Sequence, residues 1–154
     1  TWMNIVIGGL SGSFAILVGS AATGNALSTA PLILSAVLFL WTPPHFWALA
    51  ISFKDEYSKA GIPMLPVVYG DRVTSQAIFW HTLVLVILSW SLFFYGMSWI
   101  YLTFAVLGGG YFLYCSFLLL KEQTKALARK TFFSSIIHLG LLLLGAMFDA
   151  MIFA

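Results

Sequence analysis

A short charged run, KDEYSK, holds the residue types in this sequence that could do chemistry. It contains the adjacent carboxylates of Asp55 and Glu56, flanked by Lys54 and Lys59. Carboxylates bind Mg²⁺, and an ammonium group offsets the charge of phosphate oxygens. The run therefore fits a polyanion held through a divalent cation, with Asp55 on the metal and Lys59 on the phosphates. A solvated helix end is the alternative interpretation.

The stretch after this run, Gly61 to Tyr69, is apolar and contains two prolines. A solvated polar loop does not have this composition, so we interpret the stretch as a lid. Arg72 lies farther along and could add a bidentate contact to a phosphate. A charged head under an apolar cover suits an isoprenoid diphosphate whose tail lies between helices.

Pro43, Pro44 and His45 precede the charged run. Two prolines inside a helix remove amide donors, so we expect a kink or an opening there. His45 lies about 15 Å deeper than Asp55 if the helix is continuous. At about 100° per residue, His45, Ser52, Asp55 and Lys59 then fall within roughly 80°, which predicts one stripe facing one cleft. A functional role for His45 and a bond to a neighbouring carbonyl both stay open.

We favour structural roles over functional ones for the other isolated polar residues. We expect His81 and His138 to be satisfied core histidines, because each has apolar neighbours and no companion motif. Asp149 lies near the other membrane interface, where we expect it to snorkel or to cap a helix. The sequence contains no nucleotide-binding loop and no paired-cysteine or HExxH metal motif.

The composition indicates a membrane protein. The chain has 154 residues, of which 61% are hydrophobic and only 8% are charged, and the mean hydropathy is +1.00. These values exclude a water-soluble globule, a disordered chain and a nucleic-acid-binding surface. A single cysteine excludes a disulfide scaffold.

Three long segments, Thr1 to Phe53, Val73 to Leu120 and Thr131 to Phe148, contain no charged residue. Because a helical span needs roughly 20 apolar residues, they accommodate five transmembrane helices when the last is extended. We predict one all-α membrane domain over residues 1–154, with spans at about 5–22, 31–53, 76–95, 99–120 and 131–153.

All seven basic residues fall on one side of this predicted topology. The positive-inside rule then places both charged connections in the cytoplasm, or in the matrix of a mitochondrion. The net charge of +2 needs no acidic macromolecular partner, since topology and anionic headgroups account for it. The expected partner is the lipid bilayer, and no nucleic acid is expected.

Several segments together resemble a known family, the UbiA-type intramembrane prenyltransferases, and within it the protoheme IX farnesyltransferase or haem O synthase branch. The resemblance rests on WTPPHFWALA followed by KDEYSKAGIPMLPVV, with support from NIVIGG near the start and GDRVTSQ after the lid. It implies a bundle of nine helices around a cavity, of which this chain resembles the last five. It also implies two acidic motifs that bind Mg²⁺ and a prenyl diphosphate.

The resemblance assigns roles to residues of this chain. Asp55 and Lys59 match the second acidic motif and would be catalytic, and Glu56 would join Asp55 on the metal. Contacts to substrate would come from His45, Asn4, Lys54 and Arg72. The first acidic motif has no counterpart in the sequence. We therefore expect the chain to be a piece of a longer enzyme and inactive alone.

The implied reaction is Mg²⁺-dependent transfer of farnesyl from farnesyl diphosphate to a vinyl group of haem B, which gives haem O. The implied setting is the bacterial inner membrane or the mitochondrial inner membrane, with haem A synthase or the missing helices as further partners. Three alternatives stay open. They are a prenyltransferase for another acceptor such as a quinone precursor, a haem-carrying subunit with two histidine ligands, and a transporter or channel segment.

Overall fold

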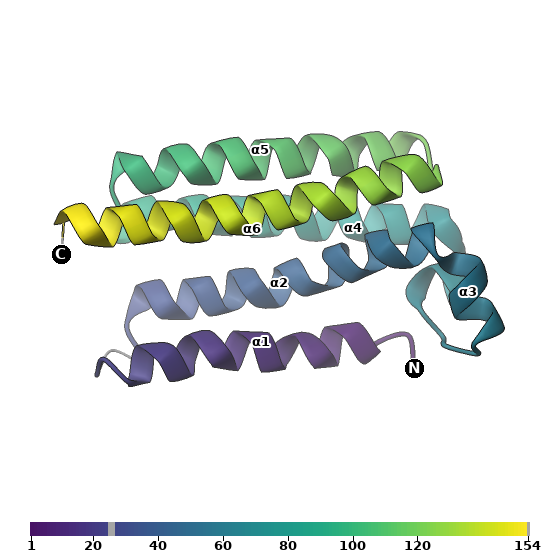
Figure 1. Cartoon of the computed structure of the whole chain (residues 1–154), viewed down its shortest axis with the longest axis horizontal. Helices are drawn as coiled ribbons and strands as arrows, with labels where there is room; N and C mark the ends of the chain where they lie inside the picture. Colours follow the sequence, from purple (N-terminus) through teal and green to yellow (C-terminus); the bar gives the residue numbers. More distant parts are fainter. Residues whose placement is uncertain (25–26, 154) are drawn as a thin grey trace.

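A computed structural model describes residues 1–24 and 27–153 of the chain. It shows a bundle of long helices, with the short helix α3 at one end (Figure 1). The helices are α1 (Asn4–Ala21), α2 (Thr29–Ser52), α3 (Lys54–Lys59), α4 (Leu65–Ser91) with the 3₁₀ turn η1 (Leu92–Tyr95), α5 (Trp99–Lys121) and α6 (Lys125–Phe153). No strand occurs in these two ranges, so the all-α prediction is confirmed.

Five helices are long and apolar enough to cross a membrane, as the sequence predicted. They are α1, α2, α4 together with η1, α5 and α6. Large apolar side chains point outward along all of them, for example Phe14 of α1 and Trp80 of α4. Such a surface suits lipid and not water, so the chain is a multi-pass integral membrane protein.

Two helices begin earlier than the predicted spans. α4 starts at Leu65 and not at Gln76, because Pro66 suits a first helical turn, where its missing amide donor costs nothing. The helix then breaks locally at Gly70, whose φ of 82° favours glycine. α6 starts at Lys125 and not at Thr131, because its charged first turns continue the helix beyond the apolar stretch.

The charged residues gather at one end of the bundle. Every lysine and arginine lies in α3, just after Gly70, or where α5 ends and α6 begins. The N-terminus lies at this same end and the C-terminus at the other (Figure 1). We call it the charged end. Its assignment to the cytoplasm or the matrix stays a prediction from the positive-inside rule.

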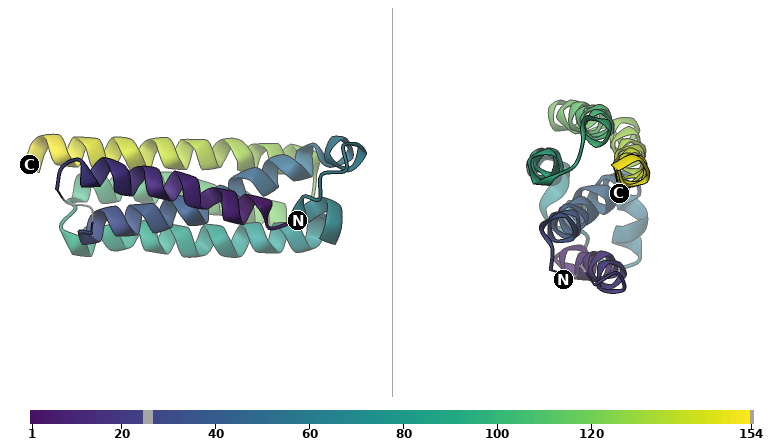
Figure 2. Two further views of the ribbon diagram at one scale, coloured as in Figure 1. Left: turned by 90° about the horizontal axis from the view of Figure 1, so that it is seen from below. Right: turned by 90° about the vertical axis from the view of Figure 1, so that its left-hand side faces the viewer.

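The helices differ in the number of neighbouring helices that they contact. α1 packs along α2 at one edge of the bundle, whereas α2 also contacts α4 and α6 (Figure 2). α2 runs as one helix through Pro43 and Pro44, so the expected opening does not interrupt it, although its ribbon bends near the middle (Figure 1). Both prolines are buried.

Small residues allow close helix packing. The GxxxG spacing of Gly8 and Gly12 in the sequence predicts that both pack against a neighbouring helix. A Cβ on Gly9 would lie 3.2 Å from Thr42 and one on Gly12 would lie 3.5 Å from Leu38, whereas Gly8 has no neighbour within 4 Å, so the prediction is wrong at Gly8. The closest approach is at Gly145 of α6, where a Cβ would lie 2.8 Å from the Cβ of Phe104.

Asp149 caps a helix at the end away from the charges. Its carboxylate accepts hydrogen bonds from the Ser98 backbone amide at 3.0 and 3.2 Å, and also from the Ser98 hydroxyl. The Ser98 hydroxyl oxygen in turn accepts from the amide of Ile100 in the first turn of α5. Asp149 is only 5% exposed, so of the two expected roles it caps and does not snorkel.

Substitution of Gly145 tests the α5–α6 contact. We expect Gly145→Ala to destabilise the bundle by about 1–3 kcal/mol relative to Gly140→Ala, because the added methyl overlaps Phe104. Gly140 lies on the same helix and has no neighbour within 4 Å, so it controls for the higher helix propensity of alanine. Unfolding in mixed detergent micelles measures the difference. Equal stability of the two variants would contradict the packing.

Candidate functional site

The helix α3, which carries the acidic residues, is tied to two other helices by ion pairs. The chain leaves helical geometry at Phe53, where φ is −116° and ψ is 31°, and α3 then starts in a new direction. Lys54 Nζ lies 2.9 Å from Asp71 Oδ1 of α4. Lys125 Nζ, from the first residue of α6, lies 2.7 Å from Asp55 Oδ2. α3 thus makes one ion pair with α4 and one with α6.

Asp55 lies on the surface of the charged end and is surrounded by cations. Its side chain is 65% exposed. The hydrogen bond from Lys125 and the charge of that residue hold the pKa of Asp55 below its usual value, and Lys59 and Lys54 lower it further. The carboxylate therefore stays ionised at neutral pH, which metal or cation binding requires.

Glu56 has different surroundings from Asp55. It lines a hollow of about 310 Å³ together with Phe53, Tyr57, Ala60 and Ile62, which we call the α3 hollow. Asp55 is not part of this lining. Consecutive residues of a helix do not face one another, which explains why the two acids diverge. The structure does not bring the predicted metal pair into one cage.

These acids nevertheless suit Mg²⁺ in one respect. In the described ranges, no group of three or more histidine, cysteine or acidic residues could hold a metal ion. Mg²⁺ is commonly held by one or two carboxylates together with waters and the phosphates of a substrate. The exposed oxygens of Asp55 and Glu56 fit that pattern, provided that the remaining ligands come from elsewhere.

The other predicted phosphate ligands lie at the same end. Lys59 is the last residue of α3 and Arg72 follows Gly70 in α4, and both side chains are exposed. Within residues 1–24 and 27–153, neither forms an ion pair. Both cations are therefore available to an anion at the charged end.

His45 lies inside the bundle and does not share a stripe with Asp55. Its ring is stacked between Trp41 at 4.2 Å and Phe132 at 4.5 Å, measured between ring centroids. The predicted stripe is wrong because the helix is interrupted at Phe53 between the two residues. The hydroxyl of Ser52 lies 3.4 Å from the carbonyl oxygens of Ala48 and Lys125, within the bundle.

His45 contacts Ser135 of α6. Its Nδ1 atom lies 2.7 Å from Ser135 Oγ, and the same hydroxyl oxygen lies 2.6 Å from the carbonyl oxygen of Phe132. The hydroxyl has one proton and donates it either to the carbonyl or to the ring nitrogen, and the tautomer of the ring follows from that choice. In both cases His45 bonds a neighbouring residue through Nδ1.

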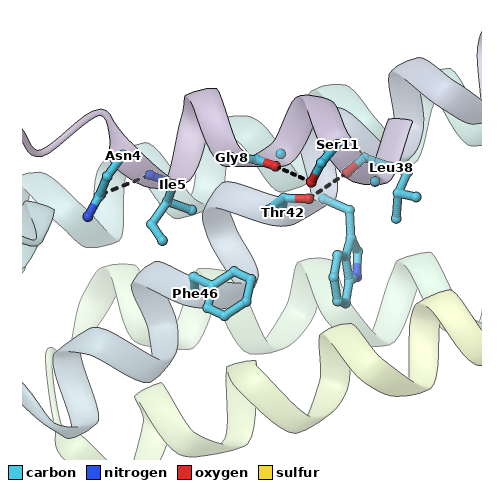
Figure 3. A pocket seen from close by; sticks show the side chains of 10 residues that line it. Asn4, Ile5, Gly8, Ser11, Leu38, Thr42 and Phe46 are labelled. Carbon is cyan, nitrogen blue, oxygen red and sulfur yellow. Dashed lines mark hydrogen bonds between the residues drawn. The ribbon is translucent and has the colours of Figure 1, made fainter. Parts of the chain in front are cut away.

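A cavity lies between α1 and α2. It has a volume of about 430 Å³, and we call it the α1–α2 pocket (Figure 3). It begins at Asn4, at the charged end, and extends along both helices. Its lining comprises Asn4, Ile5, Gly8, Gly9, Ser11, Gly12, Leu38, Trp41, Thr42 and Phe46.

The polar side chains of this pocket mostly bond their own helices. Ser11 Oγ donates to the Gly8 carbonyl at 2.7 Å, and Thr42 Oγ1 donates to the Leu38 carbonyl at 2.9 Å (Figure 3). The Oδ1 atom of Asn4 accepts from the amide of Ile5 at 2.8 Å. What remains is an apolar cavity with one amide group at its mouth, which suits a hydrocarbon chain.

The two remaining histidines differ from each other. His81 Nδ1 lies 2.8 Å from the carbonyl oxygen of Ala77, so the prediction of a satisfied histidine is confirmed. His138 is fully buried, and neither ring nitrogen has a hydrogen-bond partner. The prediction is wrong for His138, because α5 approaches it through Gly108 and the Phe112 ring and offers no polar side chain.

Sequence reasoning did not identify three residues that shape these sites. Asp71 and Lys125 hold α3, and Ser135 orients His45. Asp71 stands in the GDRVTSQ segment, in which the sequence predicted a role for its neighbour Arg72 alone. Lys125 and Ser135 belong to α6, and no local pattern indicates their partners on α3 and α2.

Comparisons with known proteins identify the family of this chain. A family model described as the UbiA prenyltransferase family matches residues 1–137. Protoheme IX farnesyltransferase 2 of Paramagnetospirillum magneticum is 50% identical over 99% of this chain and 53% of its own length. The protoheme IX farnesyltransferases of Acidovorax sp. and Verminephrobacter eiseniae are 47% and 46% identical over 97% of this chain, and the matches cover 49% and 50% of their lengths.

The chain thus spans about half the length of the curated relatives it matches. No solved structure matches it.

The Asp55–Lys125 contact predicts a pH dependence. Since the folded pKa of Asp55 is depressed, the contact is complete above the ordinary aspartate pKa and is lost as pH falls through the lowered value. We expect Lys125→Gln to raise the Asp55 pKa toward its ordinary value, as followed by carboxyl ¹³C NMR in micelles. Lys121→Gln is the control, because Lys121 lies over Phe117 and makes no ion pair within the described part. An unchanged titration in Lys125→Gln would refute the contact.

Proposed function

The chain belongs to the UbiA prenyltransferase family, and on that premise we propose that it forms the five-helix half of a protoheme IX farnesyltransferase. The reaction is transfer of the farnesyl group of farnesyl diphosphate to a vinyl group of haem B, with addition of water, to give haem O and diphosphate. The single observation that carries the proposal is an apolar pocket in a membrane bundle, one end of which lies at the same end of the bundle as the unpaired cations and exposed acids.

The diphosphate would bind at the charged end. Lys59 and Arg72 have no ion pair in the described ranges and would neutralise the oxygens of the diphosphate. Lys54, which pairs with Asp71, would add to the positive charge of this end. Asp55 would supply a carboxylate ligand to Mg²⁺, which supplies further charge neutralisation of the leaving group when bound, whereas Glu56 lines the α3 hollow and does not share a cage with Asp55. Lys125 contacts only Oδ2 of Asp55, so Oδ1 stays open to a cation. The chain's own residues thus favour departure of diphosphate by electrostatic stabilisation.

The farnesyl tail would lie in the α1–α2 pocket. Its volume of about 430 Å³ falls in the range of about 300–1,000 Å³ that is usual for small-molecule sites. Asn4 at the mouth would contact the polar head, and the apolar walls deeper along α1 and α2 exclude water. Exclusion of water protects an allylic carbocation until the acceptor arrives.

The haem acceptor would bind against the pocket wall near His45. Trp41 and Phe46 line the pocket, and both rings contact the His45 ring. The Nε2 atom of His45 is the polar group that would orient the macrocycle, through its iron or through a hydrogen bond. The 2.7 Å contact between Nδ1 and Ser135 Oγ holds the ring in position for this role.

The proposal extends to the setting of the enzyme. We place it in the bacterial inner membrane or the mitochondrial inner membrane, with the charged end in the cytoplasm or matrix. The first acidic motif and four further helices would come from the other half of the enzyme, so these residues alone should not turn over. Haem A synthase, which would use the product, is a further partner in this proposal.

Activity in the whole enzyme tests the roles at the charged end. We expect Asp55→Asn and Lys59→Ala, each placed in a chain that also carries the first acidic motif, to lower farnesylation of haem B by about 10²-fold. Glu122→Gln is the matched control, since Glu122 is exposed at the same end and has no assigned role. The assay measures haem O by chromatography and mass spectrometry.

Other outcomes would change the proposal. Parental turnover by a folded Asp55→Asn enzyme would remove Asp55 from the site. Prenylation of a quinone precursor in preference to haem B would support the family and overturn the acceptor. A stable Soret spectrum with two histidine ligands, without turnover, would favour the haem-carrying subunit.

A further inference from the structure

The lipid-facing side of α5 carries two cations above two exposed aromatic rings. Lys121 Nζ lies 4.9 Å from the centroid of Phe117. Lys130 Nζ reaches across from α6 and lies 5.9 Å from the centroid of Tyr114. The rings are 41% and 55% exposed. Cation–π attraction holds both ammonium groups over this surface at the charged end of the bundle.

The same side of α5 continues as a bare apolar surface toward the bilayer centre. Lys121, Phe117, Tyr114 and Gly110 recur at the spacing of one helix face. A Cβ added to Gly110 would have no neighbour within 4 Å, so the missing side chain leaves a shallow notch in the surface of α5 at this residue. We call this surface, from Lys121 to Gly110 together with Lys130, the α5 face.

The length of the α5 face matches one leaflet. At about 1.5 Å per residue, Lys121 lies about 16 Å from Gly110 along the helix axis. Half of a typical hydrocarbon core is about 15 Å. The face therefore runs from the headgroup level, where the cations lie, to the bilayer midplane, where the notch at Gly110 lies.

The two cations are not neutralised by the protein. The two ion pairs of the described ranges use Lys54 and Lys125, and neither includes Lys121 or Lys130. Glu122 follows Lys121 directly but makes no ion pair with it in those ranges. The α5 face thus presents two positive charges at headgroup level without a partner.

We propose that the α5 face binds one anionic phospholipid, independently of the proposed enzymatic function. Its phosphate lies between Lys121 and Lys130, and an acyl chain packs along Tyr114 and Phe117 as far as Gly110. The unpaired positive charge fits an anionic headgroup. Each basic residue near an anionic membrane surface contributes about 1 kcal/mol of binding free energy, which corresponds to about fivefold in affinity. A second copy of the chain fits poorly, because a symmetric contact would bring the same cations together.

Lipid retention in native mass spectrometry tests the site. Protein is released from nanodiscs of phosphatidylcholine with or without phosphatidylglycerol, and the bound lipids are counted. We expect one retained phosphatidylglycerol, and the variant with Lys121→Gln and Lys130→Gln should retain it about 25-fold less. The control carries Lys59→Gln and Arg72→Gln, which remove the same charge from the same end and should retain the lipid.

The aromatic part is tested separately. Tyr114→Leu with Phe117→Leu keeps all charges and should also weaken retention, because it removes the rings under the ammonium groups.

Three outcomes would overturn the site. Equal loss of lipid in the Lys121/Lys130 variant and in the Lys59/Arg72 control would show a diffuse charge effect. Displacement of the lipid by millimolar inorganic phosphate would identify a site for free phosphate and overturn the lipid. A dimer lost in the aromatic variant would identify a second copy as the occupant.

Discussion

The exclusion of charge from the bilayer core is the constraint on which the rest of this structure depends. It confines every charged residue except Asp149 to one end of the bundle. At that end, ion pairs link α3 to Asp71 of α4 and to Lys125 of α6. The electrostatic surroundings of Asp55 therefore include Lys125, a residue distant in sequence.

The interior obeys the complementary rule that polar groups in the membrane need partners. Serine and threonine hydroxyls bond carbonyls within their own helices, and Ser135 supplies the partner of His45. Asp149 satisfies the start of α5 at the other end. Among the described residues the exceptions are His138, Trp47 and Thr82, since both His138 ring nitrogens, Trp47 Nε1 and Thr82 Oγ1 have no hydrogen-bond partner. Because α1 packs along α2 and leaves a cavity beside Gly8, the apolar pocket lies at the edge of the bundle and opens toward the charged end.

Composition and charge spacing were sufficient to predict five spans, their alternation and the clustering of basic residues, since each depends on transfer from water to lipid alone. The adjacent residues Asp55, Glu56 and Lys59 were likewise recognisable as a candidate site from the sequence, and their roles stay a prediction. The break at Phe53 was not, and it overturned the stripe from His45 to Lys59. The partners Asp71, Lys125 and Ser135 were also missed, because contacts between helices distant in sequence depend on packing that no local pattern records.

The most direct test of the central claim is photocrosslinking of the whole enzyme with a farnesyl diphosphate analogue that carries a photoreactive group at the end of its tail. The account predicts crosslinks to residues that line the α1–α2 pocket, such as Leu38 and Phe46, and their loss when farnesyl diphosphate competes. It also predicts weaker labelling of the pocket in Lys59→Ala. Labelling confined to the outer surface of α5, or labelling of the pocket that farnesyl diphosphate does not suppress, would contradict the account.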